Sequence, residues 1–368
     1  MSVTVDSNPE SNASKKKIYK GIVTGSVNLN GETSNKRTYH IVIKSFEDVD
    51  YLPGDALGIV PFNKPHIVDS ILSLTQSNPD TIITHSKITA PTRQLLQYHL
   101  NISYLLKSTI KQYAALTNHD IPDTRLSLYD LLRTYPLQNN IQFTEVVQLL
   151  SIQAPRLYSI SSSPAAHGKR EIHITVAKDQ FLVAQEKRTG VGSRYLAHLE
   201  PATELEFFIQ KSRHFKLPEG DKDVIMVGPG TGIAPFRSFL FERDALQNTG
   251  RNWLFFGEQH IASDFLYRDE IQDFLNKKIL TTFDGAFSRD QKEKIYVQTR
   301  LNEKGAELYK WFENGAYFFI CGKRDPMSKD VETALIEIIK THGNKNEEEA
   351  KAYLKNLTTS GRYRKDVY

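Results

Sequence analysis

The alternation of two hydrophobic patterns after residue 220 constrains the fold of this chain most. Short apolar runs typical of buried strands take turns with longer segments in which apolar residues recur every three or four positions, as in helices. The strand-like runs are DVIMVG, NWLFFG, ILTTFD, KIYVQ and AYFFICG, and the helical segments are PFRSFLFERDAL, SDFLYRDEIQDFLNKK, AELYKWFENG and SKDVETALIEIIKTHG. This pattern predicts a parallel sheet wrapped by helices over residues 219–368, an architecture that commonly binds nucleotides.

The preceding residues follow a different plan. Runs rich in β-forming residues and punctuated by Gly and Pro occupy 18–64 and 150–218, while helical spacing fills 65–149. Each set of strands is too small to close a sheet alone. We therefore predict a discontinuous antiparallel β-barrel with an all-helical insertion, so that the whole chain is a multidomain α+β protein ending in an α/β domain. Residues 1–17 are polar and without period, which predicts a disordered tail.

Composition limits the classes of function. With 368 residues the chain is long enough for two or three domains. The net charge of +4 is too small and too dispersed to indicate nucleic-acid binding. No run approaches the roughly 20 apolar residues that span a bilayer, and no apolar signal core opens the chain, so we expect a cytoplasmic protein that does not enter the membrane. The single cysteine, Cys321, excludes an intramolecular disulfide and a cysteine-based metal site.

A glycine-rich turn follows the first strand-like run of the α/β region. Gly228, Gly230 and Gly232 permit positive φ angles and close backbone approach, and Pro235 suits the first turn of the next helix. A turn from the end of a strand into a helix N-terminus presents free N–H groups and a positive dipole, which attract phosphate. A purely structural glycine turn is the alternative, because such motifs are common.

A second group of polar residues lies about sixty positions later. Ser288, Arg289 and Lys294 surround one short loop, and Tyr296 is predicted to lie on the strand that follows. A hydroxyl, a guanidinium and an ammonium together suit a phosphomonoester, and a tyrosine ring can stack on a base. The alternative is a solvated loop of mixed charge.

Two motifs in the barrel region indicate a second nucleotide. The run RLYS at 156–159 offers a cation, an aromatic ring and a hydroxyl, in which Tyr158 would cover a flat cofactor and Arg156 would meet a phosphate. The run TGVGSRYL at 189–196 is another glycine-containing turn into a helical segment, which suits a pyrophosphate. An ordinary turn and a core tyrosine remain the alternative for these motifs. Two phosphate sites in one chain would imply two dinucleotides.

Seven motifs in this order resemble the FAD- and NADPH-binding module of the ferredoxin–NADP reductase superfamily: RLYSISSSP, GVGSRYL, GPGTGIAPFRSFL, FFGEQH, SRDQKEKIYVQ, CGKRDPMSKDVETAL and GRYRKDVY. The resemblance covers residues 18–368 and is closer to diflavin reductases, which carry a helical domain inside the FAD-binding barrel. Within these, the chain is most similar to the flavoproteins of NADPH-dependent sulfite reductases. Such proteins ordinarily begin with an FMN domain of roughly 150 residues. Only a short polar tail precedes the barrel here, so we expect no FMN site in this chain.

The resemblance implies two sets of cofactor-binding residues. The FAD set would comprise Ser103, Arg156, Leu157, Tyr158, Ser159, Thr175, Ala177, Phe181, Gly190, Val191, Gly192, Ser193 and Tyr368. The NADPH set would comprise Gly230 and Thr231 at the phosphates, Ser288, Arg289, Lys294, Tyr296 and Gln298 at the adenosine 2′-phosphate end, and Asp330.

The resemblance also implies residues around the reacting atoms. Ser159, Cys321 and Asp366 would surround the nicotinamide, and Tyr368 would stack on the flavin and move aside for the coenzyme. Cys321 lies at the end of a strand-like run, where open α/β sheets bind ligands. The alternatives are a buried hydrophobic cysteine and a frayed terminal tyrosine.

The resemblance also implies that the electrons pass to a second protein, the acceptor. The resemblance implies an NADPH-dependent FAD reductase that serves sulfite reduction, with a sulfite reductase haemoprotein as partner, directly or through an FMN protein. A general NADPH reductase for flavodoxin or ferredoxin is the alternative. A non-catalytic NADP-binding subunit is a remote one, because Ser159, Cys321 and Asp366 are all present.

Overall fold

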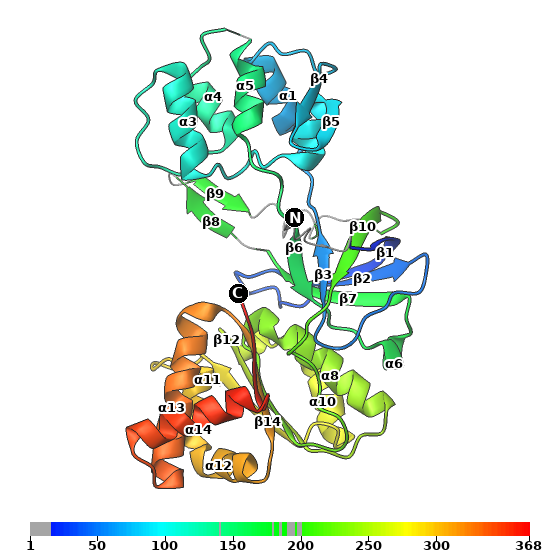
Figure 1. Cartoon of the computed structure of the whole chain (residues 1–368). Coiled ribbons are helices and arrows are strands. Elements are labelled where there is room, and N and C mark those ends of the chain that lie inside the picture. The colour runs from blue at the N-terminus through cyan, green and yellow to red at the C-terminus, as the bar shows by residue number, and fades with distance from the viewer. Residues whose placement is uncertain (1–15, 140, 179, 184–185, 190–195, 197–200) are drawn as a thin grey trace, which may run out of the picture.

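A computed structural model of the chain describes residues 16–139, 141–178, 180–183, 186–189, 196 and 201–368. Figure 1 shows three parts in a row, with a block of helices at one end, a barrel in the middle and an α/β domain at the other end. This arrangement confirms the predicted fold class, an antiparallel sheet domain followed by a parallel sheet with helices. The Ser/Asn-rich tail predicted for residues 1–17 lies almost entirely outside the described residues.

The barrel is built from two separate stretches of chain. Its elements are β1 (Ile18–Asn28), β2 (Thr38–Ser45), β3 (Ala56–Ile59), β6 (Arg156–Ser159), α6 (Pro164–His167), β7 (Glu171–Ala177), β8 (Gln180–Val183), β9 (Glu186–Thr189) and β10 (Glu204–Gln210). Six strands form one antiparallel sheet in the order β6-β3-β10-β1-β2-β7. A bridge between Ile160 and Ile174 joins the two ends of this sheet and closes it. Alternate residues face inward, such as the fully buried Ile41 and Ile43 of β2.

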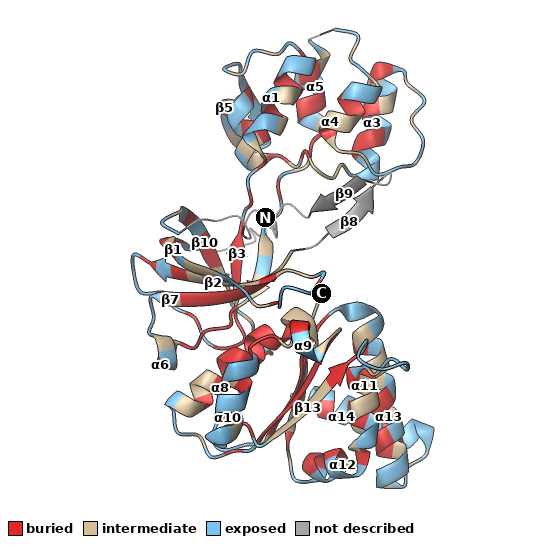
Figure 2. Ribbon diagram, turned by 180° about the vertical axis from the view of Figure 1, so that it is seen from behind, coloured by how far each residue is buried: buried red, intermediate tan, exposed pale blue. Residues whose placement is uncertain are grey.

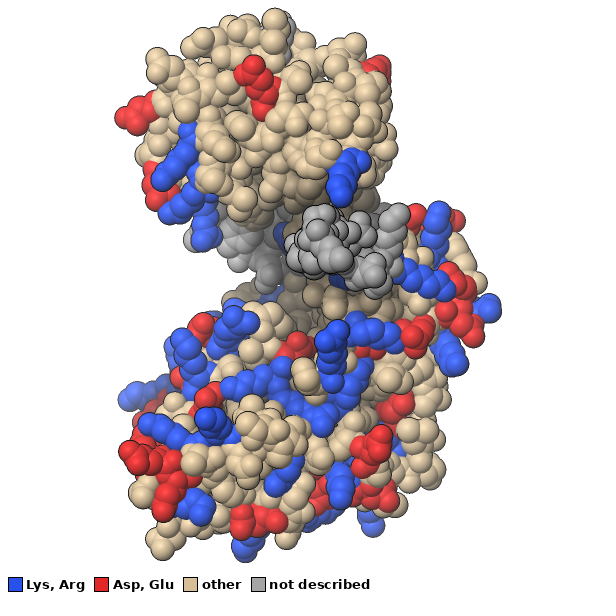
Figure 3. Space-filling model, viewed as in Figure 1, with Lys and Arg blue, Asp and Glu red and all other residues tan. Residues whose placement is uncertain are grey.

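The inserted block has its own apolar core. It contains α1 (Pro65–Leu74), β4 (Ile82–His85), β5 (Ile88–Pro91), α2 (Thr92–Gln94), the π-helix η1 (Leu95–His99), α3 (Lys107–Thr117), α4 (Leu128–Thr134) and α5 (Gln142–Leu149). The helices are as predicted, but the all-helical prediction omitted the hairpin of β4 and β5. Its two strands are four residues each, too short for their period to be separated from the surrounding helical spacing. Figure 3 shows few charged side chains on the visible face of this block.

The α/β domain has a five-stranded parallel sheet in the order β13-β12-β11-β14-β15. The strands are β11 (Val224–Val227), β12 (Asn252–Glu258), β13 (Thr282–Phe287), β14 (Tyr317–Gly322) and β15 (Tyr363–Val367). The helical elements are η2 (Gly230–Ile233), α8 (Ala234–Ala245), α9 (Ile261–Asp264), α10 (Arg268–Asn276), α11 (Val297–Glu303), α12 (Gly305–Glu313), η3 (Arg324–Ser328), α13 (Lys329–Gly343) and α14 (Glu347–Thr359).

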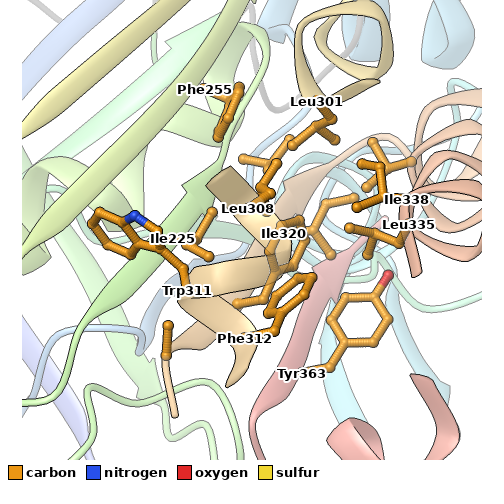
Figure 4. Close-up of a cluster of buried hydrophobic side chains, with 14 of the residues drawn as sticks. Ile225, Phe255, Leu301, Leu308, Trp311, Phe312, Ile320, Leu335, Ile338 and Tyr363 are labelled. Atoms are coloured by element: carbon orange, nitrogen blue, oxygen red, sulfur yellow. The ribbon is translucent and has the colours of Figure 1, made fainter. Parts of the chain in front are cut away.

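Both faces of this sheet are covered, which explains why its strands are apolar throughout. On β11, Ile225 and Val227 pack under α11, α12, α13 and α14, whereas Val224 and Met226 pack under α8 and α10. Figure 4 shows the first of these cores, in which Trp311 and Phe312 of α12 lie beside Ile225 and Ile320. None of the helices in the described part of the chain is long and apolar enough to cross a bilayer.

One strand prediction is wrong. The run KIYVQ at 294–298 is not a strand, because Tyr296 is the residue before the first turn of α11. The Thr299 hydroxyl accepts a hydrogen bond from the Tyr296 backbone N–H (3.4 Å), as in other helix N-termini. A run of five residues does not distinguish a strand from the first turn of an amphipathic helix.

Candidate functional site

The glycine-rich turn lies between β11 and α8, with η2 as its last turn. Gly230 has a φ of +59°, a conformation that glycine adopts without strain. Gly228 and Gly232 are required for close packing, because a Cβ on Gly228 would lie 2.6 Å from the Gly232 carbonyl oxygen and one on Gly232 would collide with the Cys321 carbonyl. The turn is therefore closely packed against the end of β14, and the N–H groups that open η2 have no partner inside that helix.

Three predicted residues meet beside this turn. The parallel register of β14 and β15 places Asp366 opposite Cys321. The thiol of Cys321 donates to Asp366 Oδ2 (3.8 Å), and the hydroxyl of Ser159 on β6 donates to the same oxygen (3.1 Å). Residues from the barrel and from two strands of the α/β domain thus converge on one carboxylate. Their sequence separations of 45 and 207 residues show that only the fold brings them together.

Burial governs the protonation of this group. Desolvation raises the pKa of the Cys321 thiol well above its ordinary value, and the nearby Asp366 carboxylate raises it further. The thiol is therefore neutral and acts as a donor. Burial also raises the pKa of Asp366, while the hydrogen bonds from Ser159 and Cys321 oppose that shift. The site holds a partly desolvated carboxylate with two donors on one oxygen.

The C-terminal residue reaches the glycine turn. Tyr368 continues the pairing of β15, with its N–H donating to Gly322 O (3.1 Å) and its carbonyl accepting from Arg324 N (2.9 Å). Its hydroxyl lies 2.9 Å from Thr231 Oγ1 in the turn. The side chain is 62% exposed.

The predicted phosphate loop follows the carboxyl end of β13. Ser288 and Arg289 come directly after this strand, and their N–H groups donate to Glu258 O and Gln259 O (2.9 Å each). Lys294 is exposed and Tyr296 is 45% exposed. Gln298 donates to Asp330 Oδ2 (3.2 Å), which links two further predicted residues.

The predicted flavin residues are distributed unevenly. On β6, Leu157 is exposed, Tyr158 is half-buried, and Arg156 donates to Ala154 O (3.0 Å). On β7, the Thr175 hydroxyl lies 2.6 Å from the hydroxyl of Tyr267 in the α/β domain, so its side chain faces that domain.

The remaining predicted flavin residues lie on other elements or outside the described residues. Ala177 pairs with Thr38 at the end of β7, and Ser103 lies in the loop before α3, bonded to Asn101. The backbone of Phe181 belongs to β8. The side chain of Phe181 and all of Gly190, Val191, Gly192 and Ser193 lie outside the described residues.

One ion pair at the turn escaped the sequence analysis. Lys36, between β1 and β2, donates to both carboxylate oxygens of Glu258 (2.8 and 2.6 Å), and Glu258 is nearly buried. A Cβ on Gly230 would lie 3.5 Å from Glu258 Oε1, so the pair borders the glycine turn. Glu258 ends an apolar run and was detectable as a strand-end carboxylate, whereas Lys36 lies in a loop without any pattern.

Comparison with known proteins finds relatives among oxidoreductases. Residues 226–333 match the family model of the oxidoreductase NAD-binding domain. The chain is similar to the sulfite reductase (NADPH) flavoprotein alpha-component of Bacillus subtilis (strain 168), at 39% identity over 98% of this chain and 62% of the relative. It is also similar to the proteins of the same name from Cronobacter sakazakii (40% identity, 92% and 59%) and Escherichia coli O1:K1 (38%, 92% and 59%). The chain thus spans about three fifths of the length of these relatives.

Proposed function

We propose, from the premise that the chain resembles sulfite reductase (NADPH) flavoproteins over almost its whole length, that it is a FAD-dependent reductase that takes hydride from NADPH and passes electrons to a protein acceptor. The observation that carries this proposal is the convergence of Ser159, Cys321 and Asp366 beside the glycine turn. It joins the two predicted nucleotide sites at one point.

The residues of the turn fit a dinucleotide. Because Gly228 and Gly232 have no Cβ atoms, the strand end and the helix N-terminus can lie close together. Thr231 adds a hydroxyl at this point. We infer that the NADPH pyrophosphate binds here, and that Ser288, Arg289 and Lys294 bind the 2′-phosphate, with Tyr296 against the adenine. Gln298 and Asp330 would support that end of the coenzyme.

The flavin would lie along β6. Tyr158 and Ser159 would hold its ring, and Arg156 its phosphates, with the remaining predicted FAD residues around them. FAD, when bound, would supply hydride acceptance and the release of single electrons. Tyr368 would cover the ring face until the nicotinamide enters. The Tyr368 hydroxyl is hydrogen-bonded to Thr231 in the glycine turn. A coenzyme that binds at Thr231 would therefore compete for this hydrogen bond and release Tyr368.

Within this site the side chains would orient the coenzyme and stabilise the charge that develops on it. Asp366 would stabilise the positive charge that develops on the nicotinamide as hydride leaves. Ser159 and Cys321 hold the carboxylate oxygen in place by donating to it. Burial of Cys321 and partial burial of Asp366 keep water away from the reacting atoms.

The test is anaerobic flavin reduction. The protein, reconstituted with FAD, is mixed with NADPH or NADH, and the flavin absorbance is followed by stopped flow. We expect rapid bleaching with NADPH and slower bleaching with NADH. Arg289→Ala should weaken NADPH binding while leaving NADH unchanged, because only NADPH carries the 2′-phosphate. Failure to bind FAD, or no bleaching by NADPH, would overturn the proposal and favour a non-catalytic subunit.

The name of the relatives, sulfite reductase (NADPH) flavoprotein, indicates the class of electron acceptor. A sulfite reductase haemoprotein, directly or through an FMN protein, is the acceptor that we propose, and reduction of flavodoxin or ferredoxin is the second candidate. Each purified carrier is offered to the NADPH-reduced protein, and sulfite-dependent NADPH oxidation is measured in parallel with the haemoprotein present. Turnover with flavodoxin or ferredoxin alone would replace the sulfite assignment by the general one.

A further inference from the structure

A cluster of buried and half-buried polar residues lies where the barrel packs on the α/β domain. The barrel contributes His40 of β2 and His173 of β7, and the α/β domain contributes Arg237 of α8 together with Tyr267 and Glu270 at α10. Figure 2 shows β7 close to α6 and α8, with buried residues on β7 and α8. None of these five residues is among those assigned to the coenzymes or to the reaction.

Arg237 is the centre of this cluster. Its side chain is only 6% exposed, and its Nε and Nη2 donate to the two carboxylate oxygens of Glu270 (2.6 and 2.7 Å). Its Nη1 donates across the interface to the carbonyl oxygen of Ser161 (2.8 Å) and to His173 Nδ1 (3.1 Å). One side chain thus holds its own domain with two hydrogen bonds and the barrel with two more. Bidentate pairing of this kind fixes direction as well as distance.

The hydrogen bonds determine the state of His173. A guanidinium can only donate, so His173 Nδ1 accepts. The proton therefore lies on Nε2, which donates to Glu171 Oε1 (2.8 Å). Burial, followed by the charge of Arg237, lowers the pKa of His40 and of His173 to about 3, so both rings are neutral. In the described part of the chain no group of His, Cys, Asp and Glu is arranged to hold a metal ion, so these rings act as acceptors and packing surfaces.

A second set of contacts joins the same two domains. The Tyr267 hydroxyl bonds His40 Nδ1 (3.0 Å) and Thr175 Oγ1 (2.6 Å), and Tyr267 adopts a φ of +56° between α9 and α10. Such a conformation is uncommon for a bulky residue and persists only where surrounding contacts hold it. Ser238, the neighbour of Arg237, donates to Ser162 O (2.6 Å). These hydrogen bonds have preferred directions, so they restrict how the barrel can be oriented against the α/β domain.

The cluster connects the two halves of the proposed site. Ser161 lies two residues after Ser159 in the segment that follows β6, and α8 begins directly after the glycine turn. A bond from Arg237 to Ser161 therefore links the helix behind the coenzyme turn to the strand that carries Ser159. We propose that Arg237 is a positioning residue, which latches the barrel to the α/β domain and thereby sets the nicotinamide against the flavin. This inference rests on the proposed function for its kinetic consequence.

The test uses Arg237→Lys, which keeps the charge but loses the planar fork. At saturating NADPH we expect the rate constant of flavin reduction to fall by about 10- to 100-fold, because small misplacements of reactants have effects of that size. The long-wavelength charge-transfer absorbance between coenzyme and flavin should weaken. The affinity for 2′,5′-ADP, which occupies only the proposed 2′-phosphate end of the coenzyme site, should stay unchanged. The matched control is Arg251→Lys, because Arg251 also pairs with a carboxylate through Nε and Nη2, at Asp223 and within one domain.

Two outcomes would overturn the latch. One is flavin reduction at the original rate with an intact charge-transfer band in Arg237→Lys. The other is a parallel loss of 2′,5′-ADP affinity, which would indicate damage to the α/β domain alone. If Arg237→Lys does not fold, Glu270→Gln replaces it, since this variant weakens the hold on the guanidinium and retains the bonds to Ser161 and His173.

A measurement without coenzyme separates the latch from the proposed function. Amide hydrogen exchange of the peptides around Ser161 and in α8 is compared between the original protein and Arg237→Lys. Faster exchange in both peptides supports the latch even if NADPH proves not to be the substrate. Unchanged exchange overturns it, whatever the reaction.

Discussion

At the residue scale, the candidate site depends on one carboxylate oxygen. Asp366 Oδ2 accepts from a hydroxyl and a thiol that come from different strands. Burial raises the pKa of this carboxyl, so its charge is less stable than that of a surface aspartate. Two donors on the same oxygen offset part of that cost. The arrangement provides a negative charge of fixed position at the meeting point of the two proposed nucleotide sites.

We expect Asp366→Asn to slow flavin reduction by NADPH about 100-fold, the usual effect of removing one preorganised electrostatic group. In the unsubstituted protein the rate should fall as the pH is lowered through the raised pKa of Asp366, because protonation removes its charge. The variant should lack this acid limb. Stopped-flow reduction across pH measures both effects.

The control for this experiment is Asp273→Asn, since Asp273 pairs with Lys277 on the surface of α10. It should keep the original rate and acid limb. An acid limb that persists unchanged in Asp366→Asn would show that another group causes it.

At the element scale, two packing events build the site. The parallel pairing of β14 with β15 sets Asp366 beside Cys321, and the glycine turn packs on the end of β14. The sequence alone predicted β14 and the turn, and the resemblance implied the role of Asp366. The pairing that unites them joins segments more than 40 residues apart, and no local pattern encodes it.

We expect Gly232→Ala to destabilise the protein by about 1–3 kcal/mol or more, because its Cβ would collide with the Cys321 backbone carbonyl. A backbone atom cannot yield by a rotamer change, so β14 must shift. The control is Gly25→Ala in β1, where a Cβ would lie 3.8 Å from a Val42 methyl group, an ordinary contact. Urea unfolding of both variants measures the difference, and equal free energies of unfolding would contradict the collision.

At the scale of the whole molecule, apolar cores hold each part together, and both apolar and polar contacts join the barrel to the α/β domain. Leu29 and Phe215 of the barrel stretches pack in the core under α8 and α10. The helical block, the barrel and each face of the parallel sheet have separate apolar clusters. Between the barrel and the α/β domain lie hydrogen-bonded groups such as Arg237 with Ser161 and Lys36 with Glu258. Directional contacts suit an interface whose geometry must be specific.

This interface should be sensitive to acid. The folded-state pKa of His40 and His173, about 3, lies below the unfolded value of 6.5, so between these values the unfolded chain binds protons that the folded chain does not. The contribution of these two rings to the stability of the native state is therefore fully present above pH 6.5, and it is lost as the pH is lowered toward 3. We expect the pH slope of the free energy of unfolding to approach two protons per molecule from these two rings.

Urea unfolding between pH 4 and 7 measures this slope. His40→Gln should reduce it by about one proton. A slope that is the same in His40→Gln and in the original protein would contradict the assignment.

The sequence by itself determined the elements and their chemistry, because hydrophobic period and glycine placement act over a few neighbouring residues. It therefore predicted the parallel sheet and the glycine turn, and it failed for KIYVQ and for the hairpin of β4 and β5, where the runs are too short to carry a period. The tertiary structure alone decided which distant residues meet. Lys36 reaches Glu258, Ser159 reaches Asp366 and Arg237 reaches His173 through strand register and domain packing. Such contacts depend on the close packing of apolar surfaces far apart in the chain, which no local pattern records.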